Sequence, residues 1–224
     1  MHAGRYRNNH ASPGAYPFEI AHGERTIVAQ YLAAIDAAQR TIYIENQALA
    51  VEAIVGSLLH ALQRGVTVAI LVPAEPEHWF RASRQRSENK GLFEKFAALG
   101  DHNHFTLAAI AVPTAMSDRN NVYVHAKLML VDDTWATIGS CNLHRNSVSG
   151  NTELNASIWD RDVVRALRCE LFAEHLGHDT AGMDDYAAFR LFGDVATENR
   201  QKREAGSFDW QGLAFSLDPA LYGA

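Results

Sequence analysis

A histidine and a lysine stand two residues apart in the segment VYVHAKLMLV, residues 122–131. Branched and aliphatic residues dominate this segment and predict a β-strand. Because side chains alternate between the two faces of a strand, His125 and Lys127 project from the same face, roughly 7 Å apart. An imidazole beside an ammonium group is suited to chemistry on a phosphate ester, in which the imidazole attacks phosphorus and the cation binds the oxygens.

The residues after this strand predict a hairpin that gathers further polar groups. Residues 132–134, Asp-Asp-Thr, are typical of a turn, and Trp135–Cys141 predicts the returning strand. A turn centred near Asp133 places residue 127 across from about residue 139, and residue 125 across from about residue 141. The hairpin therefore brings four side chains into one cluster, those of His125, Lys127, Ser140 and Asn142.

A third strand, predicted at Glu153–Trp159, offers a carboxylate to this cluster. Glu153 lies on the polar side of that strand and can accept a hydrogen bond from one imidazole nitrogen of His125. That contact fixes the tautomer of the ring and leaves its other nitrogen available. An ordinary exposed carboxylate is the alternative interpretation of Glu153. In this scheme Lys127 and the amide of Asn142 bind phosphate, so it requires no metal ion and no cofactor.

Two other pairs of histidines have the spacing of metal ligands. They are His102-x-His104 and His175-x-x-His178. Convincingly arranged cysteine or carboxylate partners are missing from both, so we interpret these residues as surface histidines and predict no metal site.

The surrounding elements that must position the cluster predict an α/β fold, a mixed β-sheet flanked by helices on both faces. Further strands are predicted at Thr41–Glu45, Val66–Val72 and His104–Val112, and helices at Thr26–Ala38, from Val51 to Leu62, within Glu75–Gly100 and at Asp162–Leu176. The unit from residue 41 to residue 72 has short connections, which predicts that its two strands are parallel.

The remaining segments lack strong periodicity. Residues 113–121 are rich in turn formers and predict a loop. We expect residues 1–224 to form a single domain, with a core at about 24–176 and a C-terminal tail at 177–224 whose charged segment 197–206 is solvated.

The composition limits the possible environments and partners. With 47% hydrophobic and 21% charged residues, the 224-residue chain resembles an ordinary soluble protein. Its net charge of −6 argues against stable sequence-independent binding to nucleic acid, and its two cysteines are too few for a disulfide framework. Apolar stretches are far shorter than the roughly 20 residues of a membrane span, and residues 1–25 lack the apolar region of a signal peptide. We expect a cytoplasmic protein, or one with peripheral membrane contact at most.

The segment from His125 to Asn142 resembles the phospholipase D superfamily. It fits the pattern HxKxxxxD-x6-GSxN at every fixed position, including Asp132, and Glu153 stands where the family has its histidine-pairing carboxylate. Upstream, IYIENQ at residues 42–47 resembles the segment that precedes the second HKD motif in two-motif members. The resemblance covers about residues 24–176, with a weaker similarity at Phe215–Tyr222.

The resemblance implies a phosphodiesterase that works in two steps. One histidine attacks phosphorus to form a phosphohistidine, while a second protonates the leaving alcohol, and water or another alcohol then resolves the intermediate. His125 would be the acid/base partner, and Lys127 and Asn142 would bind phosphate.

Further residues take roles from the same resemblance. Ser140 would donate to phosphate or to its neighbours, and Asp132 would take part in the catalytic motif or serve the geometry of the turn. Glu45, Asn46 and Gln47 would line the pocket or simply end a strand.

A complete site of this kind needs two facing HKD motifs, whereas this sequence contains a single HxK pair. The expected partner is therefore a second HKD half, either a missing N-terminal half or a homodimer mate. As function we expect hydrolysis or transfer of phosphatidyl groups on a phospholipid substrate. The alternatives are an HKD-type endonuclease active as a homodimer and an inactive half-domain that binds phosphate.

Overall fold

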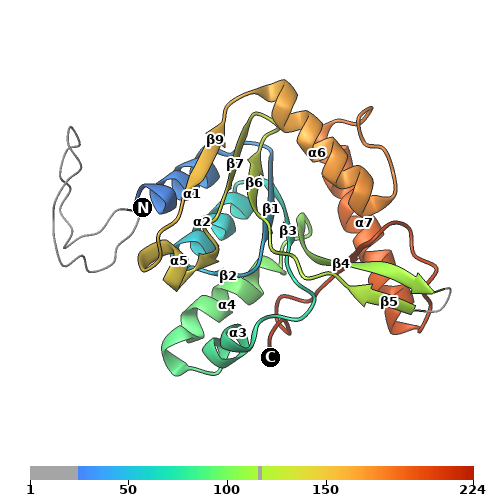
Figure 1. Cartoon of the computed structure of the whole chain (residues 1–224), viewed down its shortest axis with the longest axis horizontal. Helices are drawn as coiled ribbons and strands as arrows, with labels where there is room; N and C mark the ends of the chain where they lie inside the picture. The colour runs from blue at the N-terminus through green and yellow to red at the C-terminus, as the bar shows by residue number, and fades with distance from the viewer. Residues whose placement is uncertain (1–24, 116–117) are drawn as a thin grey trace.

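The computed structural model describes residues 25–115 and 118–224 and contains a large mixed β-sheet with helices on both faces (Figure 1). This arrangement confirms the fold class predicted from the sequence. The strand order is β10-β4-β3-β1-β6-β7-β9, with β5 paired to β4. The strands are β1 (Thr41–Asn46), β3 (Thr67–Leu71), β4 (Phe105–Ala115), β5 (Asp118–Asn121), β6 (Lys127–Val131), β7 (Trp135–Gly139), β9 (Asn155–Ile158) and β10 (Ala214–Ser216). A separate short parallel ladder joins β2 (Leu49–Ala50) to β8 (Leu143–His144).

The centre of the sheet is parallel and buried on both sides. β1 pairs in parallel with β3, and β3 with β4, as the strand–helix–strand unit predicts. Every residue of β1 is buried. Strands that are covered on both faces have continuous runs of apolar residues, so these segments show no alternation of apolar and polar residues in the sequence.

Two groups of helices cover the two faces. On one face lie α1 (Thr26–Ala37), α2 (Glu52–Gln63), α3 (His78–Arg84), the 3-10 turn η2 (Ser87–Asn89) and α4 (Lys90–Leu99). The other face is covered by α6 (Arg161–Leu176) and α7 (Asp185–Glu204), and the short α5 (Arg145–Ser149) follows β8. Among the described residues, no helix is both long and apolar enough to cross a membrane.

The C-terminal segment contributes to the sheet more than the sequence indicates. α7 buries Phe189, Phe192 and Val195 against the sheet, and β10 pairs antiparallel with β4. The charged run at 197–206 is largely the end of α7. Buried polar residues such as Asn199 interrupt the apolar stripe of this helix and hide its period.

The predicted loop at 113–121 is also partly a hairpin. β4 continues to Ala115 and pairs with β5 through an irregularity between Pro113 and Ala115, while residues 116–117 lie outside the described part of the chain. The turn formers in this segment therefore belong to a hairpin rather than to a long loop.

The β6–β7 hairpin has the predicted register. Leu128 pairs with Ile138 and Val131 with Trp135, so continuing the ladder places Lys127 opposite Gly139. The strand predicted at 122–131 starts only at Lys127, because neither neighbour continues beyond that point: β1 ends at the residue that pairs with Lys127, and β7 ends at Gly139. Residues 122–126 form an irregular link from β5 to β6.

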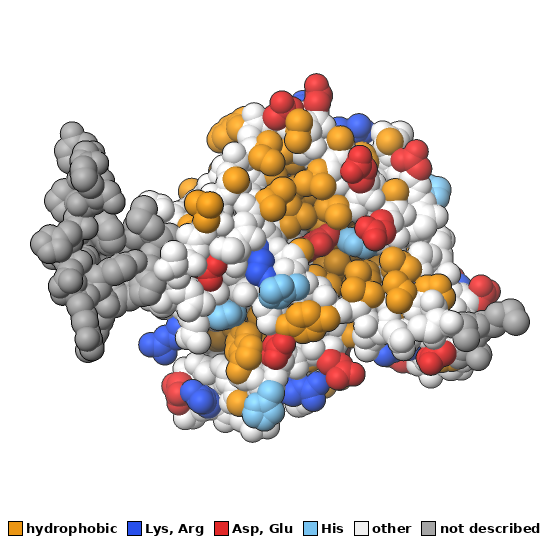
Figure 2. All heavy atoms as spheres, in the orientation of Figure 1, with side chains coloured by type: hydrophobic (Ala, Val, Ile, Leu, Met, Phe, Trp, Pro, Cys, Tyr) orange, Lys and Arg blue, Asp and Glu red, His pale blue; other side chains and the backbone are white. Residues whose placement is uncertain are grey.

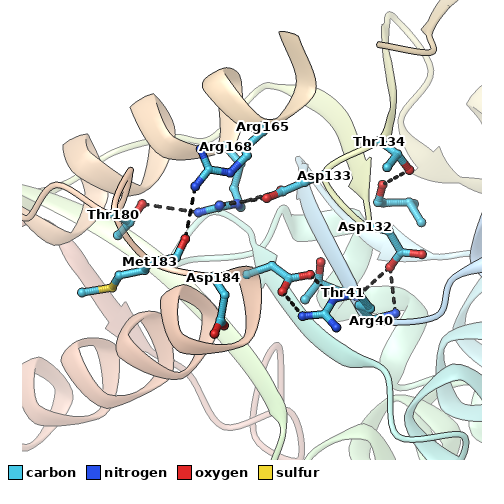
Figure 3. A network of polar contacts seen from close by, with 12 residues as sticks. Arg40, Thr41, Asp132, Asp133, Thr134, Arg165, Arg168, Thr180, Met183 and Asp184 are labelled. Carbon is cyan, nitrogen blue, oxygen red and sulfur yellow. Dashed lines mark hydrogen bonds and ion pairs between the residues drawn. The ribbon is translucent and has the colours of Figure 1, made fainter. Parts of the chain in front are cut away.

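Two adjacent carboxylates clamp the turn of this hairpin (Figure 3). Asp132 and Asp133 both have positive φ, 54° and 51°, a conformation that aspartate tolerates better than most residues and that suits a tight hairpin turn. The carboxylate of Asp132 accepts three backbone N–H bonds of 2.8 Å, from Gln39, Arg40 and Thr41. Asp132 thereby fixes the chain between α1 and β1.

Asp133 binds in the opposite direction, to α6. Its carboxylate and the Arg168 guanidinium form two hydrogen bonds of 2.7 and 2.8 Å, and both side chains are buried. Arg168 also donates to the hydroxyl of Thr180 at 3.4 Å. The turn is therefore fixed to the start of β1 and to the helix that covers the second face.

Asp133→Asn tests how much this buried ion pair contributes to the stability of the fold. Asparagine keeps the tolerance for positive φ but leaves the Arg168 guanidinium buried without a carboxylate, so we expect the free energy of unfolding in urea to fall by about 3–5 kcal/mol. Glu94→Gln is the control, because it removes only an exposed i,i+4 pair with Lys90, worth less than about 0.5 kcal/mol. Equal effects of the two substitutions would show that the buried pair does not hold the turn.

Candidate functional site

Most of the predicted site residues lie at the end of the β6–β7 hairpin opposite its turn, whereas Asp132 lies in the turn and Glu45 on the other face of the sheet. Lys127 is the first residue of β6, where it pairs with Asn46 of β1. Gly139 ends β7, and a Cβ at this position would overlap the Asn155 side chain and the Leu154 carbonyl. Only glycine lets β9 approach here, where Ser140 N donates to Leu154 O at 3.0 Å.

Ser140 and Glu153 hold each other. The Ser140 hydroxyl donates to Oε2 of Glu153 at 2.5 Å and accepts from the backbone N–H of Leu154 at 3.0 Å. The Glu153 carboxylate thus contacts Ser140. The contact with His125 that the sequence predicts stays a prediction. Burial lowers the pKa of Lys127, and the negative charge of Glu153 opposes that shift.

His125 and Lys127 are joined through the backbone. The Lys127 ammonium donates to the carbonyl of His125 at 2.6 Å, while the His125 side chain is exposed and its ring lies 6.0 Å from the ring of Tyr123. Partial burial lowers the pKa of Lys127, and the nearby Glu153 carboxylate opposes that shift. An exposed imidazole and a half-buried cation therefore lie at the same end of β6.

Two asparagine amides at this end contain buried atoms without partners among the described residues, Nδ2 of Asn46 and Oδ1 of Asn142. Oδ1 of Asn46 accepts the backbone N–H groups of Leu143, at 3.1 Å, and Ala48, at 3.4 Å. These two donors fix the orientation of the amide, so the unpaired atom is a true N–H donor. Leaving a buried donor unpaired costs about 1–3 kcal/mol, and a ligand oxygen at this point would remove that cost.

Glu45 and Gln47, the neighbours of Asn46, point elsewhere. Glu45 lies on the opposite face of the sheet, because side chains alternate along β1. There it accepts the Tyr43 hydroxyl at 2.8 Å, and burial raises its pKa. Gln47 donates to the Tyr123 hydroxyl at 2.6 Å. Of residues 44–47, Asn46 lies beside Lys127 in the cluster, and Gln47 is linked to the cluster only through Tyr123.

His175 is buried beside Glu45, whereas the sequence analysis interpreted it as a surface histidine. Its ring nitrogen Nδ1 lies 3.1 Å from the Tyr43 hydroxyl, and Nε2 lies 3.9 Å from Glu45. Burial lowers the pKa of His175 to about 4, so the imidazole is neutral near pH 7. The residue belongs to the apolar face of α6, a position that the HLGH spacing did not reveal.

Asp132 lies at the far end of β6, roughly 16 Å from Lys127 at the usual rise of a strand. Three backbone N–H groups bind its carboxylate there. These contacts favour the geometric role over the catalytic one for this residue.

His144 and Trp79 are two further residues near the cluster that were not predicted from the sequence. The half-buried His144 ring lies 4.9 Å from the ring of Trp79. Burial lowers the pKa of His144, while Glu153 raises it and Lys127 lowers it, so the imidazole lies near both groups. The alternation 140, 142, 144 could have indicated His144, but nothing in the sequence shows that α3 reaches this end of the sheet.

A broad hydrophobic area lies on the same side of the molecule, over β6, β7, β9 and α6, beside histidine and basic side chains (Figure 2). Large apolar side chains are exposed in β7, in α6 and on either side of β9, namely Ile138 at 43%, Val163 at 49%, Leu154 at 79% and Trp159 at 85%. A contiguous exposed apolar patch on a folded protein is typical of an interface.

Glu153→Gln tests the electrostatics of the cluster. The substitution removes the negative charge that raises the pKa of Lys127 and leaves the burial that lowers it. We therefore expect the pKa of Lys127, measured by NMR titration of the lysine side chain, to fall further below the ordinary lysine value. Glu94→Gln should leave that pKa unchanged. A higher pKa in Glu153→Gln would contradict the arrangement described here.

Comparisons with known proteins identify the family of the chain. Residues 31–175 match the family described as cardiolipin synthase, PLD-like domain. Phospholipase D zeta 1 of Arabidopsis thaliana is 26% identical over 217 residues, covering 72% of this chain and 20% of that protein. Cardiolipin synthase 1 of Staphylococcus epidermidis is 27% identical over 139 residues, covering 62% of this chain and 25% of that protein. The chain thus spans a quarter or less of the length of these curated relatives.

The fold also resembles that of a solved structure. NucT from Helicobacter pylori superposes with a TM-score of 0.51 at 16% identity, covering 67% of this chain and 88% of that one. The family match covers well over half of the sequence and includes the whole β6–β7 hairpin. The chain belongs to the phospholipase D-like domains of the cardiolipin synthase family.

Proposed function

We propose that this chain supplies one half of a phospholipase D-type active site, which hydrolyses or transfers phosphatidyl groups through a phosphohistidine intermediate without a metal ion. The observation that carries the proposal is the cluster at the open end of the β6–β7 hairpin. It combines the exposed imidazole of His125, the half-buried ammonium of Lys127 and the unpaired buried N–H of Asn46. The phospholipid-related names of the curated relatives support a lipid phosphodiester as substrate.

Each residue takes a role that follows from its position. Lys127, Asn46 and Asn142 bind the non-bridging phosphate oxygens and stabilise the charge that develops on them. Ser140 and Glu153 hold each other, and the carboxylate opposes the lowering of the Lys127 pKa by burial. A histidine of the second half attacks phosphorus, the bond to the leaving alcohol breaks, and His125 donates a proton to that oxygen.

The second step reverses these roles. Water or an acceptor alcohol gives its proton to His125 while its oxygen attacks phosphorus, and the phosphorus–nitrogen bond breaks. The nucleophile thereby returns to its neutral form. Both steps use only imidazole nitrogens and fixed donors, so the scheme proceeds without a metal ion.

The second half must face this one across a two-fold or pseudo-two-fold axis, because nucleophile and acid lie on opposite sides of phosphorus. The exposed apolar area over β7, β9 and α6 supports a docking surface next to the cluster. We favour an N-terminal half of a longer protein as the partner, since this chain spans only part of its relatives. A second copy of the chain is the alternative.

A nuclease active as a homodimer is the second candidate function. The likeness to NucT supports a shared fold, whereas the net charge of −6 works against binding of a polyanion. Cleavage of single-stranded DNA in preference to phospholipid would favour this candidate.

His125→Asn and Asp132→Asn together separate catalysis from geometry. In the active assembly we expect His125→Asn to lower kcat by at least about 100-fold, because it removes the proton donor, with circular dichroism unchanged. Asp132→Asn weakens three charged hydrogen bonds, so it should lower the free energy of unfolding by about 1.5–3 kcal/mol and change kcat of the folded protein less than about threefold. A loss below about tenfold in folded His125→Asn would overturn the assignment.

Assembly and metal dependence form a separate test. Light scattering measures the size of the assembly, and hydrolysis of phosphatidylcholine or phosphatidylglycerol vesicles measures its activity. We expect hydrolysis only in an assembly with two HKD motifs. Excess EDTA should leave the rate unchanged. An active monomer would contradict the half-site proposal. Loss of activity in EDTA with recovery in zinc or magnesium would contradict the metal-free mechanism.

A further inference from the structure

The segment that contains His125 lacks the support of a β-ladder. The N–H of Val122 still donates to the carbonyl of Ile110 in β4, at 2.9 Å, but residues 123–126 lie outside the strands. The buried side chain of Val124 anchors the middle of the segment, and Lys127 binds the His125 carbonyl from the far end. Neither contact fixes the direction in which the exposed imidazole points.

Tyr123, two residues before His125, supplies the contact that can fix the direction of the imidazole. Its hydroxyl accepts a hydrogen bond from Gln47, in the link between β1 and β2, and donates to the carboxylate of Glu77, at the N-terminus of α3. Burial and the neighbouring Glu77 raise the pKa of Tyr123 to about 12, so the hydroxyl keeps its proton and donates throughout the neutral range. The hydroxyl thereby joins three segments of the chain.

The ring of Tyr123 contributes differently. It is 51% exposed, so packing alone does not explain its position. Its centroid lies 6.0 Å from that of His125, with 32° between the ring planes. A shift of Tyr123 would therefore move the imidazole directly.

We propose that Tyr123, held by Gln47 and Glu77, is a positioning residue that orients the imidazole of His125 toward the bound phosphate. The inference rests on the proposed function and extends it to a chain of contacts outside the HKD motif. It also gives a role to Gln47, which lies next to Asn46 but points away from the Lys127 cluster. Misplacing a catalytic group by 1 Å can cost about 100-fold in rate, so this contact should matter for turnover more than for stability.

Tyr123→Phe tests the proposal, because it keeps the ring and removes only the hydroxyl. We expect kcat to fall by about tenfold or more while KM changes less than about threefold, because the phosphate-binding groups stay in place. In ¹⁵N relaxation, the order parameter of His125 should drop from the rigid range near about 0.85 toward the flexible range below about 0.6. Tyr186→Phe is the control, since Tyr186 is also partly exposed but contacts Arg40.

A conservative variant of Glu77 adds a rescue test. Glu77→Gln still offers an oxygen to the Tyr123 hydroxyl and should keep most of the activity, whereas Glu77→Leu should resemble Tyr123→Phe. An unchanged order parameter of His125 in Tyr123→Phe, or a mobile His125 with unchanged kcat, would overturn the positioning role. Full activity of His125→Asn would instead overturn the proposed function, while the relaxation result would stand on its own.

Discussion

The clamp on the β6–β7 turn is the constraint on which the site depends. Asp132 binds the start of β1 through three backbone N–H groups, and Asp133 binds Arg168 of α6 in a buried ion pair. The two carboxylates thus fix the turn to the start of β1 and to α6. Because register and rise along a strand are fixed, holding the turn also fixes Lys127 and Gly139 at the opposite end of the hairpin.

The candidate site lies where the ladder stops. β1 ends at Asn46 and β7 ends at Gly139, the two positions opposite Lys127, so the pairing of β6 with both neighbours stops at one place. Gly139 lets β9 approach and bring Glu153 to Ser140. The unpaired buried N–H of Asn46 is a cost of this arrangement, and an oxygen of a bound phosphate would offset it.

Local patterns were sufficient to predict the hairpin and its register. Period-two alternation and the Asp-Asp-Thr turn placed residue 127 across from residue 139, and the ladder agrees. The parallel pairing of β1 and β3 followed from their short connections. The same alternation explains why Glu45 and Asn46 lie on opposite faces of the sheet.

Other features depend on contacts between distant segments, which no local pattern contains. The burial of His175 depends on Tyr43, and the place of Trp79 beside His144 depends on where α3 packs. The early end of β6 depends on the ends of its neighbours. The buried face of α7 was obscured because polar residues such as Asn199 interrupt its apolar period.

Titration of the chain with inorganic phosphate, followed by NMR, tests the central claim most directly. The claim is that the open end of the hairpin forms a phosphate site from groups of this chain alone. We predict saturable shifts of the side-chain signals of Lys127, Asn46 and Asn142, and their loss in Lys127→Ala while the other signals of the fold are retained. Shifts confined to residues outside the hairpin end, or shifts that persist in Lys127→Ala, would contradict the account.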